Sequence, residues 1–273
     1  MFSTLRNALD FPLRQLFRWR RRGLEIRNEP KDRLFADLPD EARPLAKATA
    51  NRLVNDYHLQ RFYAHSRADN YCENLYYLEL LESALQRSRA VLPDVVHAAD
   101  IGPSQWFYVQ GLHALLTWYC PVGGSPLPEG GRAVALSGWE ADAYRVYLDF
   151  YSRHDHALAH IRDLKDVEFV PLNFEQQPQA YQFITMLFPF VFLKDHLHWG
   201  LPQPMFAPAD LLADAWASLA PGGWLIIVNQ GEAEHQTQRE LLSATGITPA
   251  ADFRHESLLY RYELARYVMA ARR

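Results

Sequence analysis

Beyond Pro93, short apolar runs alternate with longer segments in which apolar residues recur every three or four positions. The short runs have the length and β-branched content of buried strands, and the longer segments have the period of amphipathic helices. The predicted strands cover residues 95–101, 133–138, 167–171, 181–187 and 224–228, with two closing strands near 257–260 and 266–271. The predicted helices cover residues 106–118, 142–162, 210–219 and 238–244. This order predicts an α/β fold with a mostly parallel sheet, in which ligands bind beyond the carboxyl ends of the strands.

Two further segments precede this sheet domain, which we expect to span residues 94–273. Residues 28–93 contain two amphipathic windows, at 45–58 and 72–92, and are predicted to form a helical lead-in or cap. Residues 1–27 are predicted to form an amphipathic N-terminal arm. Its apolar positions recur at helical spacing and are Phe2, Leu5, Leu9, Leu13, Leu16 and Phe17. Pro12 is expected to kink or restart this helix.

Composition changes this picture mainly through the distribution of charge. With 49% hydrophobic and 22% charged residues, the chain of 273 residues can bury a core and does not belong to the disordered class. A net charge of -4 excludes a protein that coats nucleic acid. The arm nevertheless carries +5, from seven arginines against Asp10 and Glu25, which leaves -9 for the remaining chain. Cys72 and Cys120 lack metal-binding or redox spacing, so a reducing cytoplasm is the expected location.

The basic arm has three interpretations. It docks on the acidic body of its own protein or on a protein partner, it lies on an anionic membrane surface as an interfacial helix, or it contacts nucleic acid. The second interpretation would give a cytoplasmic protein a peripheral position on the inner face of the membrane. A secretory signal does not fit, because the arginines follow the apolar positions. No apolar run in the sequence reaches the length that spans a bilayer.

Polar residues follow three of the predicted strands in turn. After the first strand comes Asp100-Ile101-Gly102-Pro103-Ser104-Gln105-Trp106, a tight turn into a helix whose free N–H groups suit a polar or anionic ligand group. Glu140 follows the second strand, where a carboxylate can accept both hydroxyls of a ribose. Asn173 and Phe174 follow the third strand and suit the edge and the face of an adenine. The strand ends thus offer a turn, an acid, and an amide with an aromatic ring.

With these strand ends, residues 94–273 resemble the class I S-adenosylmethionine-dependent methyltransferases, which have a Rossmann-like seven-stranded sheet. The sequence Leu219-Ala220-Pro221-Gly222-Gly223 is similar to the segment that leads into the family's fifth strand, and Phe188-Pro189-Phe190 is similar to the loop after its fourth strand. The resemblance implies S-adenosyl-L-methionine as the cofactor. It places Asp100, Gly102 and Ser104 at the methionine end, with Gln105 in the same loop, Glu140 at the ribose, and Asn173 and Phe174 at the adenine. The sequence departs from the family pattern at Ser104 and Trp106, where glycines are usual, and at Asn173, where Asp is usual.

Residues after the fourth and fifth strands supply candidate bases and substrate contacts. Methyl transfer is an in-line displacement that needs proximity and, for an O or N acceptor, a base. The candidate bases are His196, His198 and Glu232, and the candidate substrate contacts are Phe188, Phe190, Asn229 and Gln230. His156 and His160 are spaced one helical turn apart, but no third ligand is identifiable in the sequence, so no metal site is expected.

The sequence therefore predicts S-adenosylmethionine-dependent methyl transfer to a small-molecule or lipid-like acceptor. An aromatic content of 13% and the apolar run at 186–193 favour such an acceptor over nucleic acid. The alternative is a catalytically inactive methyltransferase-like subunit that binds or scaffolds a partner and is anchored through its basic arm.

Overall fold

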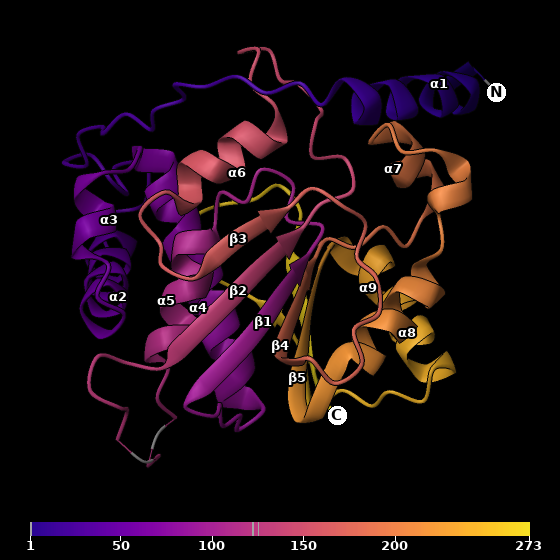
Figure 1. The fold of residues 1–273 in the computed structure, drawn as a ribbon. Helices are drawn as coiled ribbons and strands as arrows, with labels where there is room; N and C mark the ends of the chain where they lie inside the picture. Colours follow the sequence, from indigo (N-terminus) through magenta and orange to yellow (C-terminus); the bar gives the residue numbers. More distant parts are fainter. Residues whose placement is uncertain (1, 122, 125) are drawn as a thin grey trace.

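A seven-stranded sheet forms the centre of the molecule (Figure 1). The computed structural model describes residues 2–121, 123–124 and 126–273, so Met1, Val122 and Ser125 lie outside the described residues. The strands are β1 (Val95–Ile101), β2 (Ala133–Trp139), β3 (Val167–Val170), β4 (Tyr181–Leu187), β5 (Leu219–Gln230), β6 (Ala251–His255) and β7 (Arg266–Arg272). Their order across the sheet is β3-β2-β1-β4-β5-β7-β6, with β7 antiparallel to both neighbours and the other pairs parallel. The predicted α/β fold with a mostly parallel, Rossmann-like sheet is confirmed.

The strand order reverses between β1 and β4, which are neighbours in the sheet although β2 and β3 separate them in the chain. In the register of the sheet, Asp100 near the end of β1 lies opposite Gly138 on one side and Thr185 on the other. Open α/β sheets bind their ligands where the order reverses, because the connections leave the sheet in opposite directions there and open a crevice. The reversal therefore marks the carboxyl ends of β1, β2, β4 and β5 as the place to look for a site.

Helices cover both faces of the sheet, each with its own apolar core. On one face lie α4 (Ala68–Arg87) and α5 (Val109–Trp118), with α2 (Ala42–Asp56) packed against α4. On the other face lie α8 (Pro208–Ser218) and α9 (Gly231–Ala244). The remaining helices are α1 (Phe2–Phe17), α3 (Gln60–Ala64), α6 (Arg153–Ile161), α7 (Leu193–His198) and the short 3-10 helix η1 (Gln203–Met205).

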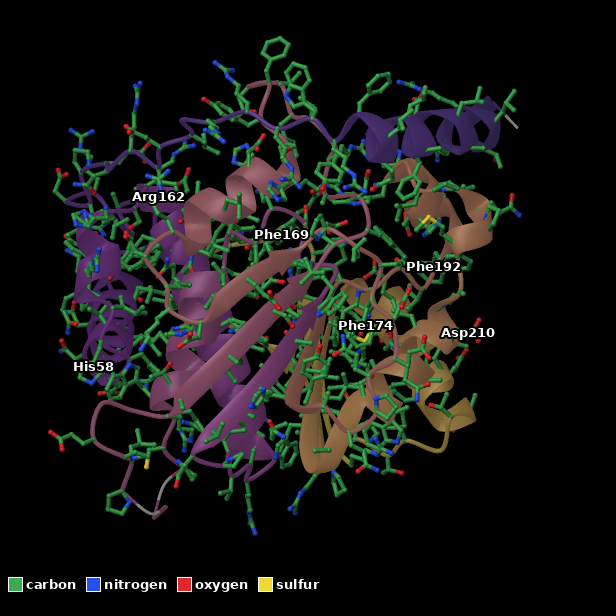
Figure 2. All side chains as sticks on the ribbon, viewed as in Figure 1. His58, Arg162, Phe169, Phe174, Phe192 and Asp210 are labelled. Atoms are coloured by element: carbon green, nitrogen blue, oxygen red, sulfur yellow. The ribbon has the colours of Figure 1, made fainter. Side chains whose placement is uncertain are left out.

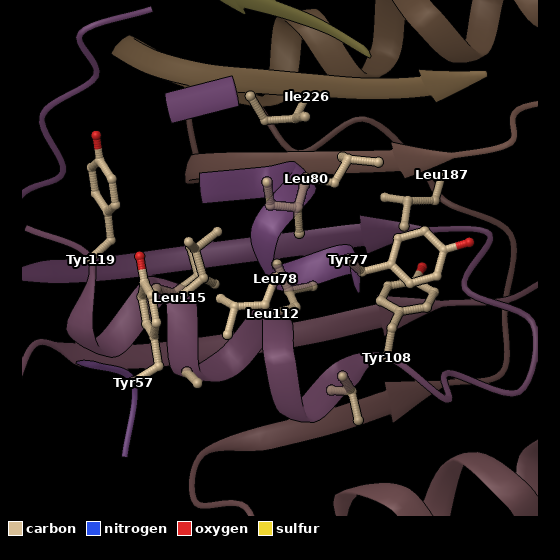
Figure 3. Packing of buried hydrophobic residues seen from close by; sticks show 14 of the residues in the cluster. Tyr57, Tyr77, Leu78, Leu80, Tyr108, Leu112, Leu115, Tyr119, Leu187 and Ile226 are labelled. Atoms are coloured by element: carbon tan, nitrogen blue, oxygen red, sulfur yellow. The ribbon is translucent and has the colours of Figure 1, made fainter. Parts of the chain in front are cut away.

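The lead-in that precedes the sheet contributes a large part of the core. The leucines spaced three or four positions apart in the amphipathic window predicted at 72–92 are fully buried in α4. Leu75, Leu78, Leu81 and Leu85 have no exposed surface. Figure 3 shows Leu78 of α4 beside Leu112 and Leu115 of α5. The same close-up places Tyr77 and Tyr108 next to each other beside Leu187, the last residue of β4. The lead-in thus reaches the carboxyl edge of the sheet with aromatic side chains.

Two expectations about individual elements are wrong, and the restart of the first helix at Pro12 is not observed. Residues 142–152 are not helical, because the side chain of Ser152 and that of Asp155 form a capping box that fixes the helix start at Arg153. The sixth strand is Ala251–His255 and not residues 257–260, which follow it as a loop. Pro12 does not interrupt α1, which runs from Phe2 to Phe17. A proline leaves the carbonyl four residues earlier without its helical N–H, and Ala8 is exposed, so water can satisfy that carbonyl.

Candidate active site

The carboxylate of Asp100 lies at the end of β1, fully buried in a cage of hydrogen-bond donors. Its Oδ2 accepts from Trp106 Nε1 at 2.7 Å and from the Tyr108 hydroxyl at 2.8 Å, and its Oδ1 accepts from Thr185 Oγ1 at 2.8 Å. Burial raises the pKa of Asp100 to about 6, even though the three hydrogen bonds favour the ionised form. Asp100 therefore fastens the loop after β1 to β4 and is not open to a ligand directly.

The loop after β1 has three residues with positive φ, the conformation that favours glycine, but only the first of them is a glycine. Gly102, Ser104 and Trp106 all adopt positive φ, at 74°, 56° and 56°. Side chains in this region are strained, so the surrounding contacts must hold them there. The Gly102 N–H donates to Trp139 O at 2.8 Å, and a Cβ at Gly102 would meet nothing within 4 Å, so this backbone faces open space. Gln105 in the same loop is half-buried.

Trp106 explains one of the departures from the glycine pattern. Its indole is fully buried and lies against Gly138 of β2, where a Cβ would come within 2.8–2.9 Å of three ring atoms. The ring also contacts Phe169 of β3, with 6.0 Å between centroids. Gly138 is thus the glycine that this site requires, and the indole gives the loop after β1 an anchor that a glycine at position 106 would lack.

Glu140 follows β2 and is nearly buried, with both carboxylate oxygens in use. Oε2 accepts from the Ser104 N–H and Oε1 from the Asp142 N–H, both at 2.8 Å. Arg153 Nη1 lies 3.5 Å from Oε1 of Glu140 and 3.5 Å from Oδ2 of Asp142. Glu140 therefore ties the loops after β1 and β2 together, at the position where the sequence places a ribose ligand.

Asp142 extends this network to the N-terminal arm. Its side chain is fully buried, and Arg14 of α1 donates to it from Nε at 2.9 Å and from Nη2 at 3.3 Å. Burial raises the pKa of Asp142, and the charges of Arg153 and Arg14 oppose that rise. Arg14, Asp142, Arg153 and Glu140 form one chain of charges from the arm to the carboxyl edge of the sheet. We call these four residues the arm–sheet ion-pair network.

The two residues expected at the adenine differ in their exposure to solvent. Asn173 is exposed after β3, whereas Phe174 is buried in the core of the α8 and α9 face. The Phe174 ring packs edge-on against Trp139, with 5.6 Å between centroids. Figure 2 places Phe174 below the end of β3, on the side of the sheet that carries α8. An amide at the surface and a ring beneath it are thus held on one loop.

Asn229 near the end of β5 is the most informative residue of the second half. Its side chain is fully buried, and within the described part of the chain neither Nδ2 nor Oδ1 has a hydrogen-bonding partner. A buried amide without partners costs about 1–3 kcal/mol. Such a cost is common where a ligand supplies the missing partners. Gln230 beside it is half-buried, and its N–H donates to Glu234 Oε2 at 3.0 Å, so Glu234 caps α9 while Glu232 stays exposed.

The segment after β4 contains the two expected aromatic contacts. Phe188 has a φ of 62° and donates its N–H to Val228 O at 2.7 Å, so its backbone is held against β5. The guanidinium of Arg266 lies 4.8 Å from the centre of its ring. Phe190 is half-buried and contacts the rings of His196 and Trp199, at 5.7 and 5.9 Å between centroids.

The two histidines of α7 differ in their surroundings. His196 is buried, and its Nε2 donates to Pro202 O at 2.8 Å, with burial lowering the pKa of the ring. His198 is exposed and lines a surface hollow of about 970 Å³. The hollow lies between α1, residues 144–146 and residues 197–200. Because its last two walls follow β2 and β4, the hollow opens on the carboxyl side of the sheet.

Sequence reasoning missed the residues that lock this edge together. Tyr108, Thr185 and Arg153 take part through hydrogen bonds or ion pairs with partners up to 85 residues away in the chain. No local pattern marks them. A usable signal was the Trp106 side chain in a position of the turn where glycine is usual, since a large residue there needs a glycine opposite it.

No protein-family model matches this sequence, and no curated protein sequence matches it either. Solved structures of similar fold include a SAM-dependent methyltransferase from Aquifex aeolicus, 14% identical with a TM-score of 0.46, which covers 82% of this chain and 97% of its own. A protein from Listeria monocytogenes assigned to the class I S-adenosylmethionine-dependent methyltransferases is 10% identical with a TM-score of 0.49, over 89% of this chain and 78% of its own.

A geranyl diphosphate methyltransferase in complex with GPP and sinefungin is also 10% identical, with a TM-score of 0.45 over 72% of this chain and 76% of its own. These three solved structures, each named as an S-adenosylmethionine-dependent or geranyl diphosphate methyltransferase, are similar to this chain in fold.

Proposed function

We propose that this protein transfers a methyl group from S-adenosyl-L-methionine to a small-molecule or lipid-like acceptor. The observation that carries the proposal is the gathering of polar groups at one edge of the sheet, beside the reversal of strand order. The open backbone at Gly102, the carboxylate of Glu140 and the exposed amide of Asn173 follow β1, β2 and β3 in turn. That order matches the methionine, ribose and adenine parts of the cofactor.

The residues fit an adenosyl group in their chemistry. The two carboxylate oxygens of Glu140 offer about four lone-pair positions, of which two accept backbone N–H groups, so two remain for ribose hydroxyls. Asn173 can both accept from and donate to an adenine edge. Among the described residues, Asn229 has no hydrogen-bonding partner for either side-chain atom, so its amide is available to a ligand. We assign it to the acceptor side, where the sequence places it.

Bound S-adenosylmethionine supplies a methyl group on a sulfonium, so the chain's own residues need only orient the acceptor and remove its proton. His198 is the preferred base, because it is exposed and lines the hollow. Glu232 is exposed at the start of α9 and is the second candidate. His196 is assigned a positioning role, since its ring N–H is committed to Pro202 and fixes the end of α7.

The hollow is the proposed place of the apolar part of the acceptor. Leu13, Phe17, Trp19 and Val146 contribute apolar surface to it, and Arg145 and His198 contribute polar groups, whereas Phe188, Asn229 and Gln230 do not line it. A lining of this kind suits an apolar molecule with one polar or anionic end. Phe190 contacts Trp199, which is the neighbour in sequence of the lining residues His198 and Gly200. The expected peripheral location on a membrane is a separate proposal, which rests on the outer face of α1.

Titration calorimetry tests the cofactor assignment. We expect S-adenosylmethionine and its demethylated product, S-adenosylhomocysteine, to bind the full chain. Glu140→Ala should weaken binding by about 1.5–3 kcal/mol, the usual value of hydrogen bonds to a charged group. Glu240→Ala, on the exposed surface of α9, is the matched control and should bind as the parent does. Circular dichroism must show both variants folded.

Absence of binding by either compound to the folded parent protein would contradict the proposal and leave the methyltransferase-like binding subunit as the remaining function. Binding that Glu140→Ala leaves unchanged would contradict the ribose assignment alone. Because Glu140 also holds two loops, Asn173→Ala provides an independent check: its side chain is exposed, so its loss should lower affinity without lowering stability.

A further inference from the structure

Helix α1 is attached to the body by its polar side. Asn7 Nδ2 donates to Leu197 O at 2.7 Å and to Leu201 O at 3.1 Å. Arg14 pairs with Asp142, and Gln15 Nε2 donates to Ala141 O at 2.8 Å. These residues share one side of the helix at spacings of seven and eight positions. The docking of the arm on its own body, one of the interpretations of the sequence, is thus observed for this side.

Most of the remaining surface of α1 is apolar and exposed. Leu5, Leu9, Leu13, Leu16 and Phe17 are 49% to 75% exposed, and Leu13 and Phe17 also line the hollow. Surface helices of globular proteins turn their apolar stripe to the core and their polar side to water, and α1 does the reverse. Full burial of a leucine or phenylalanine side chain contributes about 1.5–3 kcal/mol. An outward stripe of five such residues therefore leaves a large stabilisation unused in the isolated chain.

The loop between β2 and α6 adds to this stripe. Leu148 and Phe150 are exposed at its tip, and Figure 1 shows this loop and α1 at the same edge of the molecule. Trp19 Nε1 donates to Phe150 O at 3.0 Å, and Arg21 Nη1 donates to Asp149 O at 3.2 Å, so the chain after α1 is tied to the loop. We call the seven side chains Leu5, Leu9, Leu13, Leu16, Phe17, Leu148 and Phe150 the apolar rim.

Arginines border the apolar rim. Arg6, Arg18, Arg20, Arg21 and Arg22 are exposed on α1 or directly after it. Two nearby acids are already paired: Asp10 Oδ2 lies 3.1 Å from Arg6 Nε, and Asp149 Oδ2 lies 3.0 Å from His156 Nε2. Exposed apolar side chains with basic side chains beside them are the combination that binds the boundary between lipid headgroups and acyl chains.

We propose that the apolar rim and its bordering arginines form a docking surface for an anionic lipid bilayer. The occupant is a lipid surface and not a second copy of the chain, because a two-fold interface made of this surface would bring the five arginines of both copies into one contact and their charges would repel. No helix within the described residues is long and apolar enough to cross a bilayer. The surface therefore lies on the membrane, with the hollow between α1 and α7 opening beside it.

Vesicle co-sedimentation of the full chain tests the proposal. We expect the protein to partition onto vesicles of phosphatidylcholine with 30% or so phosphatidylglycerol, and more weakly onto phosphatidylcholine alone, with added salt reducing the difference. The double substitution Leu9→Glu and Leu16→Glu should lower the partition coefficient about tenfold or more. Leu45→Glu, at a similarly exposed leucine of α2, is the matched control and should leave it unchanged.

The arginine contribution has its own variant. Arg18→Gln with Arg22→Gln should weaken binding to anionic vesicles and leave binding to phosphatidylcholine alone as it was. Equal partitioning of the parent and the Leu9→Glu, Leu16→Glu variant, or no partitioning at all, would overturn the proposal. So would light scattering that shows the parent as a dimer and the same variant as a monomer, because the rim would then be an interface between copies. None of these readouts needs the cofactor, so the outcome is independent of the proposed methyl transfer.

Discussion

At the scale of single residues, the carboxyl edge of the sheet contrasts two kinds of buried polar group. Asp100 has three donors around it and acts as a structural fastener. Asn229 is just as buried and, among the described residues, has no partner for either side-chain atom. A folded chain tolerates such a group where function requires it. The two residues should therefore respond in opposite ways to removal of their polar atoms.

Replacement of Asn229 by leucine, which has a similar size, should stabilise the protein. The variant no longer buries an unsatisfied amide, so the free energy of unfolding should rise by about 1–3 kcal/mol. Chemical denaturation measures this change. If Asn229 contacts the acceptor, the same variant should turn over more slowly while it binds S-adenosylhomocysteine as before. A decrease in stability would mean that the amide has partners in solution, such as ordered water, and would remove it from the site.

Asp100 should make stability depend on pH. Its folded pKa is raised to about 6 from the ordinary value of 3.8, so its contribution is fully present below pH 4 and is lost as the pH rises through 6. The loss is on the order of 3 kcal/mol for a shift of this size. Other buried groups titrate in the same range, so the quantity to follow is the difference in unfolding free energy between the parent and Asp100→Asn from pH 4 to pH 7. A constant difference would contradict the raised pKa.

At the scale of elements, the local periodicity of the sequence predicts the bounds of an element correctly where most of that element's own residues are apolar and buried. The bounds of β1 and β4 agree with the prediction from the sequence, because each is mostly apolar and its second half, from Ala98 in β1 and from Phe183 in β4, is buried without interruption. The prediction failed at residues 142–152, whose apolar spacing imitates a helix. There the chain follows contacts with distant segments, including Arg14 at Asp142 and Trp19 at Phe150, which no local window contains.

The same reasoning limits what could be predicted of the site. Glu140 and Asn173 follow strands, so their position at the carboxyl edge was evident from the order of elements. The indole of Trp106 over Gly138 and the Arg153 ion pairs join segments that are 11 to 32 residues apart in the chain and come together only in the folded sheet. A single sequence carries no signal for such pairings beyond the residue types themselves.

Helix α1 should depend on one ion pair for its docking. Arg14→Gln leaves the buried carboxylate of Asp142 with Arg153 as its main partner, at 3.5 Å. It removes the two Arg14 hydrogen bonds to Asp142 and the one to Gly200 O at 3.0 Å. We expect the free energy of unfolding to fall by about 1–3 kcal/mol and amide hydrogen exchange of residues 2–17 to accelerate. Arg61→Gln is the control, because its ion pair with Asp163 is exposed on both sides and should contribute little. Unchanged exchange in α1 would show that Asn7 and Gln15 hold the helix without Arg14.

At the scale of the whole molecule, the separation of charge found in the sequence has a structural meaning. The basic arm lies across the carboxyl edge of an acidic body, and the arm–sheet ion-pair network connects the two. Arg14 reaches Asp142, Arg153 bridges Asp142 and Glu140 at 3.5 Å from each, and Glu140 holds the loop after β1 through the Ser104 N–H. The outward side of the same arm carries the apolar rim. Helix α1 thus connects to the proposed cofactor site on one side and carries part of the proposed lipid-docking surface on the other.

This arrangement predicts that arm docking and cofactor binding stabilise each other. If a ribose binds Glu140 only while Arg153 and Asp142 hold it in place, displacement of Arg14 should weaken S-adenosylhomocysteine binding, and bound S-adenosylhomocysteine should slow hydrogen exchange in α1 by the same factor, because coupling between two sites is reciprocal. We expect a factor of about five or more, the lower end of typical coupling energies. Calorimetry on Arg14→Gln and hydrogen exchange on the parent with and without ligand measure the two directions, with Arg61→Gln as the control for both. Faster hydrogen exchange in α1 of Arg14→Gln, with unchanged affinity for S-adenosylhomocysteine, would show that the arm and the cofactor site are independent. The arm–sheet ion-pair network would then serve only to attach the helix.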